Sequence, residues 1–152
     1  MIVRQAQTRE DLKTFYRFPH IVYKGNKCHR ATEESLVHLL VSGPTAFHTH
    51  ARVKPCLIID STVVVGRFAL IHDEHLPEFV QVAFFEAVPG LRDMDQLLMK
   101  EARAWVPEAK KIVIGLNGHL NYGAGILLDH FDQAPVFGLP YTPDYYPHYF
   151  KS

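Results

Sequence analysis

Three long runs of β-branched and aliphatic residues fill the middle of the chain, and this feature constrains the fold most. The runs are "KPCLIID", "TVVVGRFALIHD" and "FVQVAFFEAV". Each has the composition of a β-strand, and Asp60-Ser61 between the first two is typical of a tight turn. Short connections favour antiparallel pairing of neighbouring strands. The sequence therefore predicts a three-stranded antiparallel meander.

The chain ahead of this meander begins with a strand and a helix. "IVRQAQ" alternates apolar and polar residues, as a half-buried first strand does. "REDLKTFY" follows Thr8 and has an acidic first turn, which is typical of a helix start. Pro19 is expected to end this helix, because proline disfavours helical conformation in the residue before it.

Two further segments have helical signals. "TEESLVHLLVSG" predicts a second helix that Thr32 caps and Gly43 closes. After the meander, "MDQLLMKEARAWVPEA" spaces its apolar residues at helical period and ends at a proline. We therefore expect two helices before the meander and one after it.

The last part of the chain completes the expected element order. "KKIVIGL" is a continuous apolar run suited to a buried strand, and we expect a short helix and a final strand after it. Residues 1–152 then form a single α/β domain with a mixed central sheet, an antiparallel meander and helices on both faces.

The composition excludes several classes of partner. The 152 residues include 16 Lys plus Arg and 16 Asp plus Glu, so no net charge attracts nucleic acid or an anionic membrane. The N-terminal residues lack the apolar stretch of a signal peptide, and no apolar run is long enough to span a bilayer. Cys28 and Cys56 form no CxxC pair. These features predict a cytoplasmic protein.

The element order resembles that of the GNAT-type N-acyltransferases. Local segments are similar to an uncharacterised bacterial branch of that superfamily over roughly residues 58 to 150, while the first third fits by element order alone. These segments are "VVGRFALI", "AFFEAV", the helix with Trp105, "NGHLNYGAGILLDHF" and "PVFGLPYTPDYYP".

The resemblance implies that acetyl-CoA or another acyl-CoA binds between two splayed strands. One is the last strand of the meander, whose free backbone groups near Val88 would donate to the acyl oxygen and hold the pantetheine arm. The pyrophosphate would then lie near Gly90 and Arg92, on backbone N–H groups before the next helix. The usual glycine pattern is degenerate here, because Arg92 and Met94 occupy positions where glycine is usual.

Glu86 and Tyr122 are the candidate catalytic residues. Members of the superfamily often carry a catalytic glutamate near the end of this strand, and the flanking phenylalanines favour a raised pKa for Glu86. The alternative is that Glu86 faces solvent or makes a structural hydrogen bond. The resemblance places Asn121 beside the second splayed strand, but the tyrosine that usually protonates the thiolate is replaced by Leu128. Tyr122 is the substitute nearest to it.

The tyrosines of the C-terminal segment have two interpretations. Tyr141, Tyr145 and Tyr146 lie among three prolines and are candidates for the wall of an acceptor pocket. Alternatively, they pack the last strand over the sheet and make the end of the chain rigid.

The ten histidines raise the question of a metal site. His48 and His50 would share a face of an extended segment, and His72 and His75 are three residues apart. Spacing supplies no third or fourth ligand, and there is no HExxH motif. We therefore expect no metal.

Two functions remain open on the sequence. The first is an acyl-CoA-dependent N-acyltransferase that acts on a small amine or amino-acid-like acceptor. The second is a catalytically degenerate GNAT fold that serves as a ligand-binding or interaction module. Relatives often continue past the Tyr-Tyr-Pro segment, so the chain is either a short homologue or a fragment. An open sheet edge left by a missing half would favour a homodimer.

Overall fold

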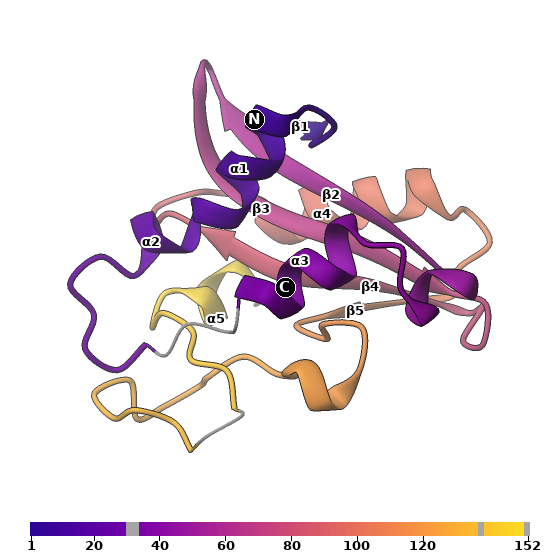
Figure 1. The fold of residues 1–152 in the computed structure, drawn as a ribbon. Coiled ribbons are helices and arrows are strands. Elements are labelled where there is room, and N and C mark those ends of the chain that lie inside the picture. Colours follow the sequence, from indigo (N-terminus) through magenta and orange to yellow (C-terminus); the bar gives the residue numbers. More distant parts are fainter. Residues whose placement is uncertain (30–33, 137–138, 151–152) are drawn as a thin grey trace.

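The computed structural model describes residues 1–29, 34–136 and 139–150. It has a mixed α/β fold in which helices cover both faces of one sheet (Figure 1). The strands are β1 (Ile2–Gln5), β2 (Ala51–Asp60), β3 (Val63–Asp73), β4 (Phe79–Ala87) and β5 (Lys111–Ile114). The α-helices are α1 (Arg9–Arg17), α2 (Pro19–Val22), α3 (Glu34–Ser42), α4 (Met94–Trp105) and α5 (Tyr146–Tyr149), and the 3-10 helices are η1 (Ala46–Thr49) and η2 (Leu120–Tyr122).

The predicted meander is confirmed. The strands lie in the order β1-β2-β3-β4-β5, and each of the first three pairings is antiparallel. The fourth pairing, between β4 and β5, is parallel, because α4 connects these strands across one face of the sheet. The sheet is therefore mixed, as the sequence predicts.

The start of α1 matches the helix signal in the sequence. The Thr8 hydroxyl accepts from the backbone N–H of Asp11 at 3.1 Å, and the Asp11 carboxylate accepts from the Thr8 N–H at 3.2 Å. This reciprocal capping satisfies two N–H groups that have no partner within the helix. Arg4 forms an ion pair with Asp11 at 2.7 Å and so links β1 to α1. Pro19 opens α2 directly after α1 ends.

The two faces of the sheet carry separate hydrophobic cores. On one face, α1 and α3 pack Phe15 and Leu40 against strand residues such as Ile71. On the other face, α4 packs Met94 and Leu98 against the alternate residues of the same strands. Since successive strand residues point to opposite faces, the largely apolar runs of these strands supply both cores.

The short helix expected after "KKIVIGL" is present as the 3-10 helix η2, next to an isolated bridge between Leu116 and Ala124. The expectation of a last strand is wrong. The C-terminal segment forms α5 rather than a last strand, because Pro140, Pro143 and Pro147 cannot donate to a ladder. The predicted cap at Thr32 lies outside the described residues, whereas α3 ends at Ser42, just before Gly43.

Candidate functional site

Strands β4 and β5 separate halfway along β4. Their parallel pairing runs from Phe79↔Lys111 to Val82↔Ile114, and its last hydrogen bond joins the Gly115 N–H to the Val82 carbonyl at 3.0 Å. Beyond this point β4 continues to Ala87 without β5 and stays paired with β3 on its other side. The predicted gap between two splayed strands is therefore present.

A β-bulge in β4 lies at the point of separation. Phe84 has a φ of 52°, which is strained for a bulky residue, and the register between β3 and β4 shifts here. The Phe84 N–H points away from β3 and donates to Oδ1 of Asn117 at 2.8 Å. Strained residues of this kind concentrate at functional sites. The bulge thus turns β4 toward the loop that follows β5.

This loop is held against β4 by two side-chain amides. Asn117 accepts from Phe84 and donates to the Tyr122 carbonyl at 3.4 Å. Gln81, which is buried, accepts from the Gly118 N–H at 2.9 Å. Asn121, which the resemblance places beside the second splayed strand, is exposed, and Asn117 makes these contacts. Asn117 directly follows the apolar run "KKIVIGL" in the sequence, and this position was the available signal.

A cavity of about 920 Å³ occupies the gap between the strands. Aromatic and apolar side chains form most of its wall, and a few polar groups converge on it, as is typical of ligand sites. Five candidates from the sequence analysis line it, namely Glu86, Tyr122, Asn121, Tyr141 and Tyr146. The other four, Val88, Gly90, Arg92 and Tyr145, are not among its lining residues.

Glu86 is the carboxylate of this cavity. Its Oε2 accepts a hydrogen bond of 2.6 Å from the Tyr146 hydroxyl, which itself accepts from the Ala87 N–H at 2.9 Å. Burial raises the pKa of Glu86, and the positive charge of Arg67 and the hydroxyls of Tyr146 and Tyr23 oppose that rise. The predicted upward direction of this pKa shift therefore has a physical cause.

Arg67 is a functional candidate that the sequence analysis missed. It lies opposite Glu86 in the β3–β4 register and is only 5% exposed. Its Nη1 donates to the Phe15 carbonyl at 2.6 Å, while its Nε is buried without a hydrogen-bond partner among the described residues. A single arginine within the most apolar run of the chain was the available signal.

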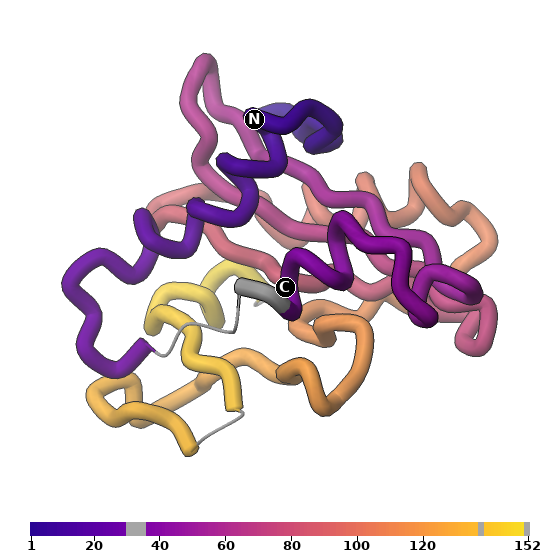
Figure 2. The backbone as a smooth tube through the Cα atoms, viewed as in Figure 1, coloured from indigo at the N-terminus to yellow at the C-terminus, as the bar shows by residue number. Residues whose placement is uncertain are grey.

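The C-terminal tyrosines make specific hydrogen bonds to β4. Tyr145 donates to the Ala87 carbonyl at 2.8 Å, and Tyr149 donates to the Val88 carbonyl. The Val88 N–H donates to β3 through Val65. The prediction that the backbone groups near Val88 are free is therefore wrong. The C-terminal tyrosines and β3 bond to them. Figure 2 shows the C-terminal segment returning to this end of the sheet.

Tyr141 has a partly structural role. Its hydroxyl donates to the Phe131 carbonyl at 2.8 Å and accepts from Asn26 at 3.1 Å. Its own carbonyl accepts from the buried Tyr23 hydroxyl at 3.2 Å. Tyr141 thus lines the cavity and also joins the C-terminal segment to the segment after α2.

The loop between β4 and α4 lies apart from the residues that line the cavity. Gly90 has a φ of 83° and open space where a Cβ would lie, and Arg92 is exposed. Asp93 occupies the N-cap of α4 in the left-handed region without a side-chain capping bond. With Asp95 in the first turn, two carboxylates therefore stand at the positive end of this helix.

A second hollow, of about 800 Å³, adjoins the cavity and shares Tyr16 and His20 with it. Arg9, Lys13 and Arg17 line it from α1, where a spacing of four residues places them on one stripe. This hollow has a basic wall, although the chain as a whole is neutral.

The comparisons with known proteins agree with this architecture. The chain is similar to a solved structure described as "Tandem GNAT protein from the clavulanic acid biosynthesis pathway (without AcCoA)", with a TM-score of 0.52 and 13% sequence identity. The match covers 76% of this chain and 36% of that chain. At this identity the likeness shows the fold alone, which is GNAT-like.

No protein-family model matches the chain, and the search of curated proteins finds no match either. None of the helices within the described residues has both the length and the apolar character that a bilayer crossing requires. The comparisons therefore support an acyltransferase-like fold and leave the chemistry to the residues of the cavity.

Proposed function

We propose that the chain is an acyl-CoA-dependent N-acyltransferase that acts on a small amine or amino-acid-like acceptor. The observation that carries this function is the position of Glu86. Its carboxyl group lies in a cavity of about 920 Å³ where β4 and β5 separate, and burial raises its pKa. A carboxylate with a raised pKa is a more effective base toward an ammonium group at neutral pH.

In the proposed reaction, Glu86 takes a proton from the ammonium group of the acceptor. The free amine then attacks the thioester carbonyl, so that a C–N bond forms and the C–S bond breaks. The departing thiolate takes a proton, for which Tyr122 at the cavity wall is the candidate donor. The nitrogen of the new amide loses its remaining extra proton, which restores the Tyr122 hydroxyl, and Glu86 releases its proton to solvent.

The reactive end of an acyl-CoA fits the residues of the cavity. Its volume suits an acyl group with a small acceptor. The unpartnered Nε of Arg67 is a buried donor on the same wall, and a polar atom of the substrate would satisfy it. Bound acyl-CoA would supply the activated thioester carbonyl.

The fit at the pyrophosphate end is poorer. The open backbone of Gly90 and the charge of exposed Arg92 favour a phosphate near this loop. The carboxylates of Asp93 and Asp95 oppose it. We therefore expect the affinity to come mainly from the cavity and less from the phosphates.

Helix α5 covers the part of β4 that a pantetheine arm would use. The Ala87 and Val88 backbone groups already bond to Tyr145, Tyr146 and Tyr149. An acyl donor and α5 would therefore compete for the same edge. If α5 stays on that edge, acyl-CoA cannot bind there. The alternative function is then expected, in which the GNAT fold binds a small ligand in the cavity without acyl transfer.

The basic stripe on α1 supports an acceptor with an acidic group. An amino-acid-like acceptor carries an ammonium group, suited to Glu86, and a carboxylate, suited to Arg9, Lys13 and Arg17. Because the two hollows share Tyr16 and His20, one molecule can contact both walls.

The test is an assay of acyl transfer from acetyl-CoA to a panel of amino acids and simple amines. The release of free CoA thiol measures the rate. We expect turnover with the wild-type chain and a loss of about 100-fold or more in kcat for Glu86→Gln. Exposed Glu108, in the turn after α4, provides the matched control Glu108→Gln, which should keep full activity. Binding of amino acids without any thiol release would favour the ligand-binding alternative.

A further inference from the structure

Two histidines and an aspartate from separate segments meet at the opposite end of the β3–β4 hairpin from Glu86. His50 directly precedes β2, Asp73 is the last residue of β3, and His75 lies in the turn to β4. The register pairs Ala51 with Asp73, and the Glu74 N–H donates to the His50 carbonyl at 2.8 Å. The backbone therefore fixes the three residues relative to one another.

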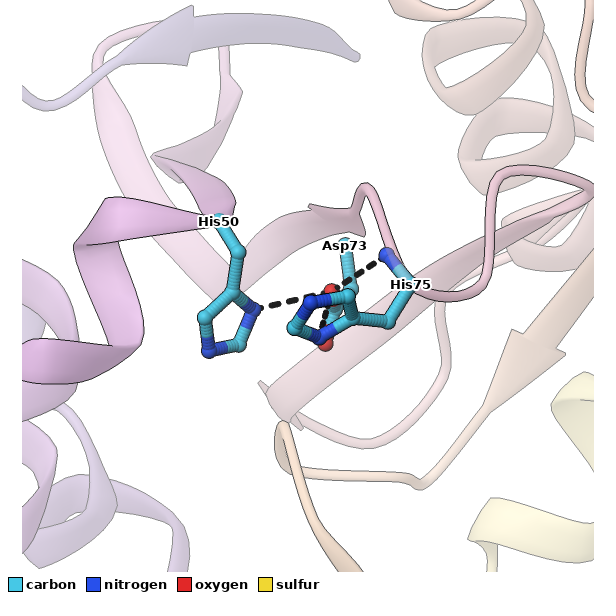
Figure 3. A group of neighbouring side chains, drawn as sticks. All are labelled: His50, Asp73 and His75. Carbon is cyan, nitrogen blue, oxygen red and sulfur yellow. Dashed lines mark hydrogen bonds and ion pairs between the residues drawn. The ribbon is translucent and has the colours of Figure 1, made fainter.

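Their side chains converge on one point, as Figure 3 shows. Nδ1 of His50 lies 2.9 Å from Oδ1 of Asp73, and Nδ1 of His75 lies 3.5 Å from the same oxygen. The two imidazole rings stack with their centroids 4.3 Å apart. One ligand atom from each residue can be chosen so that all three lie within 4.8 Å of one another.

These separations are close to those of a metal centre. Zinc bonds of about 2.0–2.2 Å at tetrahedral angles place neighbouring ligand atoms about 3.4 Å apart. The separation of 3.5 Å is already close to this value, the separation of 2.9 Å is shorter, and all the ligand atoms lie within 4.8 Å of one another. Two imidazole nitrogens and one carboxylate oxygen are a donor set that divalent zinc favours.

The site is open to solvent on one side. The side chains of Asp73 and His50 are 12% and 28% exposed, whereas that of His75 is 71% exposed. An ion can therefore enter past His75 and bind at the ring nitrogens and the carboxylate. A fourth position would remain for water.

The histidine pairs that the spacing suggested do not form this site. Nδ1 of His48 lies 2.9 Å from the Thr45 hydroxyl, and both ring nitrogens of His72 have partners, in Arg52 and the Pro77 carbonyl. His72 lies in β3 beside Asp73, so strand alternation turns it to the other face. The third ligand comes from a separate segment, which spacing alone does not show.

From this geometry we propose that His50, Asp73 and His75 bind a divalent transition metal of the zinc class. The ion would join the start of β2 to the β3–β4 turn. The site lies outside the cavity that contains Glu86, because none of its three residues lines that cavity. Its role is therefore to stabilise this end of the sheet.

The test uses the untagged full chain, freed of metal with a chelator and titrated with ZnCl₂ by calorimetry at about pH 7.5, where free imidazoles are neutral. We expect one ion per chain and a rise in Tm when it binds. His75→Ala and His50→Ala should each weaken binding by at least about tenfold. His75→Ala removes an exposed side chain and should leave the fold intact.

His130 supplies the matched control. It forms a pair with Asp129 at the same distance of 2.9 Å, and no third ligand joins that pair among the described residues. His130→Ala should therefore keep the wild-type zinc affinity. Absence of stoichiometric binding, or equal weakening in His130→Ala and His75→Ala, would overturn the proposal.

Discussion

The hydroxyl of Tyr146 donates to Glu86 at 2.6 Å, although 60 residues separate the two along the chain. The same hydroxyl accepts from the Ala87 N–H. A single oxygen thus joins the candidate base to the helix that covers the free edge of β4. The protonation of Glu86 and the packing of α5 are therefore linked.

The first prediction concerns this oxygen. Tyr146→Phe leaves the Ala87 N–H without its acceptor and removes the 2.6 Å hydrogen bond to Glu86, so we expect a loss of about 1.5–3 kcal/mol in the free energy of unfolding. Tyr145→Phe removes one bond to a carbonyl and should cost about 0.5–1.5 kcal/mol. Urea denaturation of both variants measures the difference. An equal or larger loss for Tyr145→Phe would contradict the bridging role of Tyr146.

The second prediction concerns pH. Because burial raises the pKa of Glu86 above its usual 4.5, the folded state binds more protons than the unfolded state between these two pKa values. The contribution of Glu86 to stability is therefore present below pH 4.5 and is lost as the pH rises through the folded pKa. The slope reaches about 1.4 kcal/mol per pH unit at most.

Glu86→Gln has no such proton to lose. The difference in unfolding free energy between wild type and Glu86→Gln should therefore fall as the pH rises above 4.5. Denaturation of both proteins over a series of pH values measures this difference. A difference that rises with pH would mean that the folded pKa is lowered.

The third prediction compares two glycines with nearly equal backbone angles. Gly115 has a φ of 84° and a Cβ there would lie 3.3 Å from the Gly125 carbonyl oxygen, whereas Gly90 has a φ of 83° and open space around it. Substitution by alanine carries a conformational cost of about 1 kcal/mol or more at both. Gly115→Ala should cost more, because the loop after β5 must also shift. Equal decreases in Tm for the two variants would show that the loop after β5 shifts without a cost in stability.

The fourth prediction tests the acidic group of the acceptor. Arg17→Ala removes a charge from the basic stripe on α1, so the KM for an amino-acid acceptor should rise by about three- to tenfold with kcat nearly unchanged. For an amine without a carboxylate, the KM should stay the same. Arg103→Ala, an exposed arginine on α4, is the control. A rise in KM for both kinds of acceptor would argue against charge recognition.

Much of the fold is predictable from local patterns. The three apolar runs predict the strands of the meander, and Thr8 predicts the start of α1. Both predictions succeed because strand composition and helix capping depend on residues that are close in the sequence. The last strand expected in the C-terminal segment is wrong, because this segment forms α5. Its conformation depends on hydroxyl bonds to β4, such as that of Tyr145, and these join parts of the chain that no local pattern connects.

The candidate site is predictable in part for the same reason. Glu86 follows from its place near the end of a strand, and the cavity contains it as expected. Asn117, Arg67 and the ligand set around Asp73 depend on which strands lie side by side and in what register. Spacing along one segment does not contain that information.

The most direct test of the central claim is calorimetric titration of the purified chain with acetyl-CoA, paired with a thermal shift. We expect saturable binding of one molecule per chain. At about 100 times the Kd, the ligand should add about 2.7 kcal/mol and raise the Tm by roughly 5–10 °C. No heat and no shift at millimolar acetyl-CoA would contradict an acyl-CoA site between β4 and β5.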